Sequence, residues 1–493
     1  MIRSCCLYFS FILFGLFVGC STQPSHVKVV TMEAPIYPDY KDVSIPYNIA
    51  PLNFLHTEDA TSMLVTLYGE KDSLQVSGDN QICFPLARWK EWINEERGHS
   101  IRISLQAKVG EDWLQYPDFH WYIVPEPVDA YLTYRLIEPG YEVWNELQIC
   151  ERKVEDFTER VIADNNLTQG SCMNCHFHAT NTGGKELSFF HLRGKGGGTV
   201  LNQSGKLRKL ALKDDKMVSS AVYGDIHPTG TLGVFSSNVI IPAFHAEGTR
   251  RLEVYDTVSD LVMADFETGQ LIHSPQISDS THLETFPVFS ADGREVFFCS
   301  APAVMLPDSI HSLHYSLCRI GFDTKTKQWG TKVDTLWKAT SRKGSACFPK
   351  PSPDGRFLLF TIADYGTFPI WHAETDLLLM DLQTGELDSL EVVNANRSDT
   401  YHSWSSNSRW FVFASKRDDG QYGKPYFVYL DASGKAHKPF VLPQEDPAYY
   451  QFTLKSYNLP DLAPYPVSFT ALDIRNLYAK EAEVLTDKCV VEK

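Results

Sequence analysis

Tight turns followed by short hydrophobic runs recur through the second half of the chain. Four segments share one template, in which the run ends in Phe, five residues after a Gly or its Ser replacement. These segments are 227–235, 290–298, 352–360 and 405–413, and a weaker copy lies at 184–189. Asp-Gly and Asn-Ser at the turn are typical of a β-hairpin, because that turn needs a residue that tolerates positive φ.

A second template follows each copy of the first and again predicts strand, turn and strand. It is centred on Asn202, Asp265, Asp323, Asp381 and Asp431, which are 63, 58, 58 and 50 residues apart. Two hairpins per repeat give sheets of four strands, and radial stacking around an axis buries both faces of every sheet. The chain therefore predicts an all-β fold with a C-terminal β-propeller of five or six blades, over residues 161–475, and a tail at 476–493.

The region before the propeller reads as a separate, small β-sandwich-like domain at residues 34–160. Apolar and polar residues alternate from Ile101 to Val109, as in a half-buried strand. Segments 62–68 and 121–124 predict further strands, and 86–96 predicts one short helix. This domain either braces the propeller or binds a partner, and the sequence leaves both interpretations open.

The first 20 residues have the pattern of a bacterial lipoprotein signal peptide. An apolar run follows Arg3 and is too short for a stable membrane span, and it ends at Cys20 in Phe-Val-Gly-Cys. Cleavage there would leave Cys20 as an acylated N-terminus, with residues 21–33 as a tether. We expect a membrane-anchored lipoprotein, on the outer membrane and facing the periplasm. The alternative is an ordinary secretory signal in which Cys20 is accidental.

Composition limits the partners of this chain. Of its 493 residues, 43% are hydrophobic and 13% aromatic, enough for a large core that is rich in β structure. The net charge of −16 argues against nucleic acid as a partner. We expect contact with a membrane through the lipid and with a periplasmic or membrane protein.

The segment Cys172-Met-Asn-Cys175-His176 spells Cys-x-x-Cys-His, the spacing that attaches a c-type haem. Two thiols at this spacing can form thioethers with the two vinyl groups of one porphyrin, and His176 then offers its imidazole to the iron as proximal ligand. The motif predicts one covalent haem c. A redox dithiol and a metal-binding pair are the alternatives.

A haem iron that serves only in electron transfer usually has a sixth ligand from the protein, His or Met. His191 ranks first because it lies in the returning strand, Met217 ranks second and His178 third. The alternative for His191 is a hydrogen-bonded strand histidine.

Aromatic and His side chains also gather near the ends of the predicted inner strands of two neighbouring blades. A mouth lined in this way would suit a sugar, a peptide or a protein, whereas packing between blades is the alternative. The residues concerned are Tyr365, Trp371, His372, Tyr401, His402 and Trp404.

The turn Ser-Pro-Asp-Gly-Arg at 352–356 and its copies resemble those of the TolB-like propeller family. More narrowly, segments 171–176, 190–199, 363–372, 398–420 and 455–460 resemble those of a group of Bacteroidetes TolB-like lipoproteins that carry a haem-type motif. The resemblance implies a propeller fold and a haem but no settled activity. The fourth turn, 406–408, departs from the pattern because it lacks Pro-Asp-Gly.

Two classes of function follow. In the first, a periplasm-facing lipoprotein carries one haem c on its propeller and acts in electron transfer or redox sensing. In the second, a TolB-like propeller serves as a protein- or ligand-binding or assembly module, with a structural haem or none. We expect no enzyme, because no Ser nucleophile elbow and no zinc-protease motif occurs, and a peroxidase-like haem activity is a minor alternative.

Overall fold

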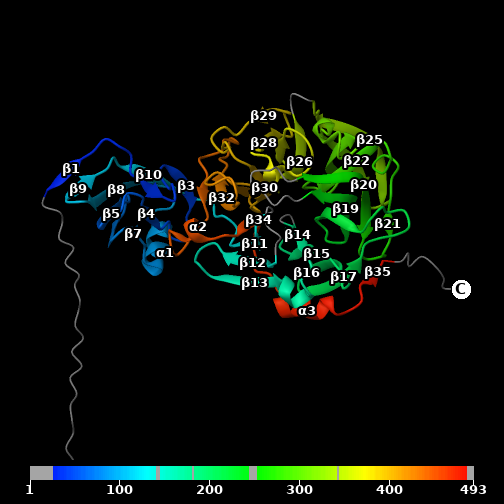
Figure 1. Ribbon diagram of the computed structural model, residues 1–493, viewed down its shortest axis with the longest axis horizontal. Coiled ribbons are helices and arrows are strands. Elements are labelled where there is room, and N and C mark those ends of the chain that lie inside the picture. Colours follow the sequence, from blue (N-terminus) through cyan, green and yellow to red (C-terminus); the bar gives the residue numbers. More distant parts are fainter. Residues whose placement is uncertain (1–25, 140–144, 180–181, 244–252, 341–343, 486–493) are drawn as a thin grey trace, which may run out of the picture.

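In the computed structural model, sheets are arranged around a common centre, with a separate β domain at one side (Figure 1). The structure describes residues 26–139, 145–179, 182–243, 253–340 and 344–485. Cys20, the signal segment 1–20 and the last part of the tail lie outside the described residues. The expected all-β class, with a C-terminal propeller and a preceding β domain, is confirmed, and the described residues form six blades.

We number the blades along the chain from the first complete one. Blade 1 consists of β14 (Met173–His178), β15 (Leu187–Leu192), β16 (Gly198–Gln203) and β17 (Lys206–Ala211). Blade 2 consists of β18 (Ala221–Ile226), β19 (Leu232–Ala243), β20 (Glu253–Asp265) and β21 (Leu271–Ile272). Blade 3 consists of β22 (His282–Phe289), β23 (Glu295–Pro302), β24 (Ser316–Asp323) and β25 (Gln328–Trp337). Blade 4 consists of β26 (Ser345–Pro351), β27 (Phe357–Ala363), β28 (Asp376–Asp381) and β29 (Leu387–Asp388). Blade 5 consists of β30 (Asp399–Trp404), β31 (Trp410–Ser415), β32 (Lys424–Tyr429) and β33 (Phe440–Val441). Neighbouring strands within each of these blades are antiparallel.

Blade 6 joins two distant parts of the chain. Its innermost strand, β34 (Ser456–Ala463), pairs with β11 (Tyr131–Ile137), which is followed outward by β12 (Leu147–Lys153) and β13 (Glu159–Asp164). The predicted domain boundary at 160 therefore falls inside a propeller sheet. Sequence periodicity could not reveal this, because the first three strands of blade 6 precede the recurring turns by many residues.

The predicted tail also belongs partly to the propeller. Helix α3 (Ala471–Tyr478) packs on blades 1 and 6 through Ile474, Leu477 and Tyr478, and β35 (Glu483–Val484) pairs with β17. The short helix α2 (Tyr449–Phe452) lies between β33 and β34.

The recurring turns have the conformation that their residues require. Gly230, Gly293 and Gly355 have φ of 78°, 73° and 74°, and Ser408 replaces Gly with a φ of 60°. Each turn joins the two inner strands of its blade, as the first template predicts. In three copies of the second template, the Asp carboxylate accepts hydrogen bonds from backbone N–H groups two and three residues further on, as Asp381 does from Gln383 and Thr384. Asp431 instead accepts from the N–H groups of Ser433 and Lys435.

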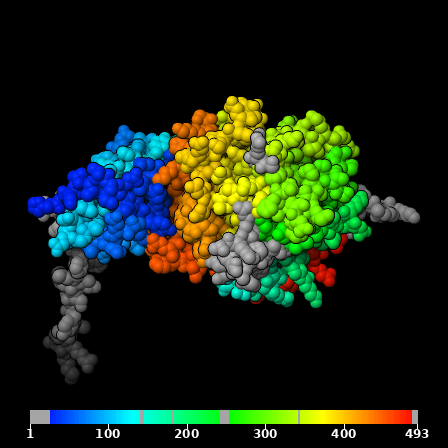
Figure 2. Space-filling view, turned by 45° about the horizontal axis from the view of Figure 1, so that its top comes forward, coloured from blue at the N-terminus to red at the C-terminus, as the bar shows by residue number. Residues whose placement is uncertain are grey.

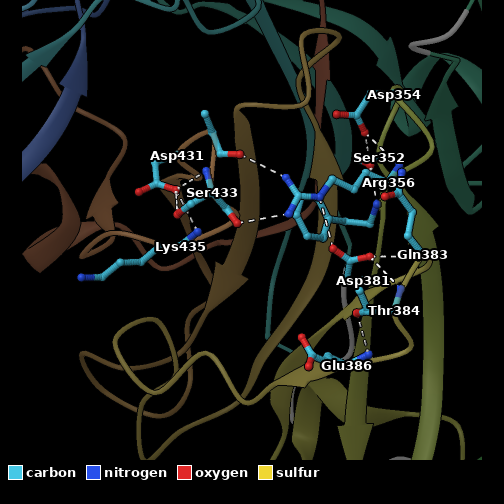
Figure 3. A network of polar contacts seen from close by, with 12 residues as sticks. Ser352, Asp354, Arg356, Asp381, Gln383, Thr384, Glu386, Asp431, Ser433 and Lys435 are labelled. Atoms are coloured by element: carbon cyan, nitrogen blue, oxygen red, sulfur yellow. Dashed lines mark hydrogen bonds and ion pairs between the residues drawn. The ribbon is translucent and has the colours of Figure 1, made fainter.

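Arg356, in the turn of blade 4, links two blades (Figure 3). Its Nε donates to Asp381 Oδ2 at 3.2 Å within the blade, while Nη1 and Nη2 donate to the carbonyls of Ala432 and Ser433 in blade 5 at 3.0 and 3.2 Å. The matching residue of blade 3, Arg294, is 85% exposed, and its nearest carboxylate oxygen, on Asp292, is 3.8 Å away.

The innermost strands carry a β-bulge at corresponding places around the ring. In the described part of the chain, register shifts occur in β14, β18, β22, β26 and β30, and in the pairing of β34 with β11. A bulge re-aims side chains locally. Phe286, Phe348, Tyr401 and Leu459 stand in these bulges with φ between 51° and 53°.

Side chains of one blade accept hydrogen bonds from the inner edge of the next. Asp225 Oδ2 accepts from Phe289 N at 2.8 Å, Ser403 Oγ from Leu462 N at 3.1 Å, and Asp461 Oδ2 from His178 N at 2.6 Å. The last of these bonds connects blade 6 to blade 1, across the closure of the ring.

The N-terminal domain has two sheets and one helix. The larger sheet contains β1 (Val27–Val29), β3 (Val43–Pro46), β5 (Ser62–Tyr68), β6 (Ser73–Gly78), β8 (Ser100–Val109), β9 (Asp112–Gln115) and β10 (Phe119–Val124). The smaller contains β2 (Ile36–Tyr37), β4 (Phe54–His56) and β7 (Gln81–Ile82), beside α1 (Leu86–Glu95). The predicted helix and strands thus agree closely with α1, β5, β8 and β10. Within the described segments, no helix has the length and apolar character needed to cross a bilayer.

This domain packs against blade 5 (Figure 2). The two share one hydrophobic core. Trp410 Nε1 donates to the Glu126 carbonyl at 3.0 Å, and Asn407 Nδ2 donates to the Pro127 carbonyl at 2.6 Å. Ser406 donates to Asp129 through its backbone N and its hydroxyl. The fourth turn, which departs from Pro-Asp-Gly, is therefore the turn that holds the segment between the two domains.

We predict that Arg356→Ala lowers the free energy of unfolding of the propeller by about 1–2 kcal/mol, because it removes hydrogen bonds that a charged group donates across two blades. The matched control is Arg294→Ala, which we expect to change stability by less than about 0.5 kcal/mol. Calorimetric unfolding of both variants checks the prediction. Equal effects of the two substitutions would contradict the stabilising link between blades 4 and 5 that we assign to Arg356.

Candidate functional site

The axis of the propeller contains a chamber of about 180 Å³. Every blade contributes residues of its innermost strand to the lining, so the bulges described above form the wall. The lining residues on these strands are His176, Phe177, Tyr223, Gly224, Phe286, Pro287, Val288, Phe348, Pro349, Lys350, Tyr401, His402, Ser403, Leu459, Pro460 and Asp461, and Arg135, Phe189 and Phe368 complete it.

An arc of aromatic rings covers blades 2 to 5. The ring centroids of Tyr223 and Phe286 are 4.5 Å apart, those of Phe286 and Phe348 are 4.1 Å apart, and those of Phe348 and Tyr401 are 5.1 Å apart. The first and third separations lie in the range that aromatic pairs prefer, about 4.5–7 Å, and the second is slightly shorter. The arc therefore gives the chamber a continuous apolar wall on one side.

Blades 6 and 1 give the other side a polar character. His176 is buried, and neither ring nitrogen makes a well-aligned hydrogen bond to a described residue, although the carbonyls of Thr133 and Leu459 lie near the ring and weakly favour its protonated form. Burial, with smaller contributions from His178 and Arg135, lowers the pKa of His176 to about 3. The imidazole is therefore neutral near pH 7. It can accept a hydrogen bond or bind a metal ion.

A charged neck divides this chamber from a second one, of about 60 Å³, on the side of the recurring turns. Phe177, Val288, Lys350, Ser403 and Asp461 line both chambers. Lys350 Nζ lies 4.2 Å from the centroid of the Phe177 ring.

Two buried carboxyl groups lie at or beside the neck. Burial raises the pKa of Asp225 and of Asp461 to about 6 each, and the nearby Lys350 ammonium partly offsets this rise. Asp225 lies in the second chamber and Asp461 lines both. The charge of Lys350 is thus balanced within the neck.

The haem motif does not converge on one face of β14. His176 lines the chamber, whereas the partly buried Cys172 packs against a hydrophobic cluster that includes Leu147, Phe190 and Leu477. The structure describes the backbone of Cys175 but not its side chain. An apolar cavity of roughly 150 Å³ takes up benzene, and a porphyrin is several times larger. In this arrangement, the motif and the chamber therefore do not fit a haem with two thioether links, and we derive no step through one.

The predicted distal ligands lie in three different places. His191 pairs with Asn174 on the neighbouring strand, and its Nδ1 is 2.9 Å from Thr199 Oγ1. Met217 packs between blades 1 and 2, and neither residue lines the axial chamber. His178 lines the second chamber, on the opposite side of the neck from His176.

The predicted aromatic cluster does not form one mouth. Tyr401 and His402 line the axial chamber, and Trp404 lies at the second chamber, where its Nε1 donates to the Lys350 carbonyl at 2.9 Å. All three lie on β30, where the bulge between Thr400 and Ser403 interrupts the alternation of side chains, so the adjacent residues Tyr401 and His402 line the same chamber.

The other three residues of that cluster come from the loop between β27 and β28. Tyr365 Oη donates to Glu253 Oε1 at 3.1 Å, and His372 Nε2 lies 3.4 Å from the same carboxylate oxygen. Trp371 lies on η3 (Pro369–Trp371) beneath Lys416, whose Nζ is 3.2 Å from the indole centroid. Burial lowers the pKa of Lys416 to about 7.

Sequence reasoning missed several lining residues, and one signal could have found them. The missed residues Tyr223, Phe286 and Phe348 each stand four residues before the first residue of a recurring turn, as does Tyr401, which the sequence did single out. The turn template alone therefore marks the aromatic arc, once the position four residues upstream is compared between repeats. Arg135 carries no such signal because it lies on the second strand of blade 6.

Comparisons with known proteins add little to this geometry. No family model matches the chain, and no curated protein is similar to it. Solved structures with some likeness include TolB from Acinetobacter baumannii, with 11% identity over 77% of this chain and 85% of that one and a TM-score of 0.39. A hypothetical selenium-binding protein from Sulfolobus tokodaii has 10% identity over 78% and 92%, with a TM-score of 0.41. Oligogalacturonate lyase from Vibrio parahaemolyticus has 10% identity over 62% and 92%, with a TM-score of 0.32. At these values the likeness carries no argument about this chain, whose fold stands on its own sheet pairing.

We predict a pH dependence of stability that His402 causes. Its Nε2 donates to the Leu359 carbonyl at 2.9 Å, yet burial lowers the pKa of the ring to about 3. In the unfolded chain the pKa is about 6.5, so below that pH only the unfolded state takes up the proton. Stability due to neutral His402 is therefore lost as the pH falls.

Between pH 7 and pH 5, the unfolding free energy of the native chain should fall by about 2 kcal/mol more than that of His402→Gln. Urea titrations across this range measure the difference. Asp225 and Asp461 act in the opposite direction, since their pKa values are raised, but both are present in the two proteins. Parallel pH profiles for the two proteins would show the prediction to be wrong.

Proposed function

We propose that this chain is a cell-envelope binding protein whose propeller holds one small organic ligand in the axial chamber. The observation that carries the proposal is the ring of bulges, which aims residues of every blade at one cavity and leaves the His176 ring without a well-aligned hydrogen bond to any described residue. Protein pockets with a mostly apolar wall and a few convergent polar groups are the default sites for such ligands.

The strain in the wall supports this proposal. Phe286, Phe348 and Tyr401 have positive φ, which is uncommon for a bulky residue and costs free energy. Such strain is concentrated at functional sites, where the surrounding fold maintains it. A wall that served only to fill the axis could do so with relaxed strands.

The location is part of the same proposal. Acylation at Cys20 would place the described domains on the periplasmic side of the outer membrane, and the N-terminal domain would stand between the anchor and the propeller. Through this domain, or through the face around the chamber, the protein would meet a periplasmic or membrane protein partner. We propose no catalytic activity.

Phe286→Leu tests the chamber. We expect at least one small compound to raise the melting temperature of the native chain, in a panel of benzoate, benzyl alcohol, benzylamine and cyclohexanol. Phe286→Leu should lose most of this shift, because it removes the ring that contacts both Tyr223 and Phe348. Thermal denaturation with and without each compound measures the shifts.

The matched control is Phe298→Leu, which changes a buried Phe of the same blade that packs away from the axis. It should lower the melting temperature of the free protein but keep the ligand-induced shift. If no compound shifts the native chain, or if both variants lose the shift equally, the axial chamber is not the binding site.

An electron-transfer or redox-sensing protein with one haem c is the second candidate. The position of His176 in the axial chamber favours it, because a buried neutral imidazole is a suitable iron ligand. Such a haem would require β14 to rearrange, so that Cys172 reaches the side that His176 faces.

A spectrum decides between the two candidates. If the second is right, the protein exported from cells that mature other c-type cytochromes will show a reduced-minus-oxidised haem band and covalent haem after denaturing electrophoresis. Cys175→Ala and His176→Ala would each abolish loading while the propeller still folds. A colourless protein from such cells would eliminate the haem candidate and leave the first proposal intact.

A further inference from the structure

The two sides of the axial chamber differ in chemistry. Blades 2 to 5 supply the aromatic arc, whereas blades 6 and 1 supply Arg135 and His176. A ligand that suits both sides must present an apolar ring to one and a polar group to the other.

Arg135 gives the polar side a charge that the protein does not balance. Its Nε is buried without a hydrogen-bond partner, and among the described residues no carboxylate lies within ion-pair distance of its guanidinium. Lys350, the other cation of the wall, lies near Asp225 and Asp461. Arg135 is partly buried, and charges that are withdrawn from water in proteins are normally paired. The anion that Arg135 lacks can come from a ligand.

Guanidinium groups recognise carboxylates with particular strength. The planar fork of N–H donors matches two carboxylate oxygens, and such charge-assisted bonds are about twice as strong as neutral ones. The neighbouring imidazole of His176 adds a polar group on the same side of the chamber.

The volume of the chamber limits the apolar part. At about 180 Å³, it is slightly larger than an apolar cavity of roughly 150 Å³ that takes up benzene. One ring with a short acidic substituent fits within this space.

We propose that the axial chamber takes an aromatic carboxylate with a single ring, such as benzoate, with the ring against Phe286 and Phe348 and the carboxylate on Arg135. This inference rests on the proposed function, because it specifies the ligand of the same site. It explains why an arginine with no carboxylate partner among the described residues lines the axis of an acidic chain.

Calorimetric titration of the full chain with benzoate, benzyl alcohol and benzylamine tests the proposal. We expect benzoate to bind at least about tenfold more tightly than benzyl alcohol, and benzylamine to bind weakest, because its ammonium faces Arg135. Arg135→Gln should lower the affinity for benzoate about tenfold or more, while that for benzyl alcohol stays within about twofold. Arg294→Gln, which changes an exposed arginine, is the control and should leave both affinities unchanged.

The outcomes separate the two proposals. If benzyl alcohol binds as tightly as benzoate, or if Arg135→Gln weakens both equally, the carboxylate proposal is overturned and the chamber remains a binding site. If neither these compounds nor cyclohexanol binds, both proposals fail. Should Arg135→Gln not fold, Arg135→Lys keeps the charge, and the preference of the native chain for benzoate over benzyl alcohol still decides.

Discussion

The inner edge of each blade must satisfy its backbone N–H groups, and the rest of the propeller depends on how it does so. An innermost strand has a ladder partner on one side only, and an unpaired N–H away from water costs free energy. Asp225, Ser403 and Asp461 accept such groups from the following blade. Blade 3 has Val288, which cannot accept a hydrogen bond, at the position of Asp225. The residue of blade 4 that corresponds to Phe289 is Pro351, which has no N–H to satisfy. The same hydrogen bonds that satisfy the edges thus hold the blades in order around the axis.

This arrangement explains why polar residues line the neck of a mostly apolar axis. Asp225 and Asp461 are placed there as hydrogen-bond acceptors between blades, and Lys350 lies among them and offsets their charge. In the axial chamber, the aromatic side chains at the bulges do not serve as acceptors in these hydrogen bonds between blades. The side chains there, from Tyr223 to Tyr401, make contacts with one another instead, and Arg135 projects from a second strand with no structural partner among the described residues.

Local signals in the sequence predicted the fold because blades 2 to 5 repeat them. The αL positions at Gly230, Gly293 and Gly355, and the Asx turns at Asp265 and Asp381, are short-range chemistry that a single sequence displays. The pairing of β34 with β11 could not be predicted in this way, since it depends on contacts between distant segments. The chamber could be predicted in part. Its aromatic wall repeats in register with the turns, but the position of Arg135 and the separation of Cys172 from His176 depend on how the ring closes.

The closure of blade 6 has a consequence for how this protein reaches its native state. Thr133 on β11 donates to the carbonyl of Asp461 on β34, 328 residues further along the chain. Contacts of such high sequence separation slow folding, because the entropy of closing a long loop is lost before the contact forms. Until β34 arrives, β11 presents an open edge on which another chain can add a strand. Aggregation during synthesis and export is therefore the hazard that this topology creates, and it is greatest just before the ring is complete.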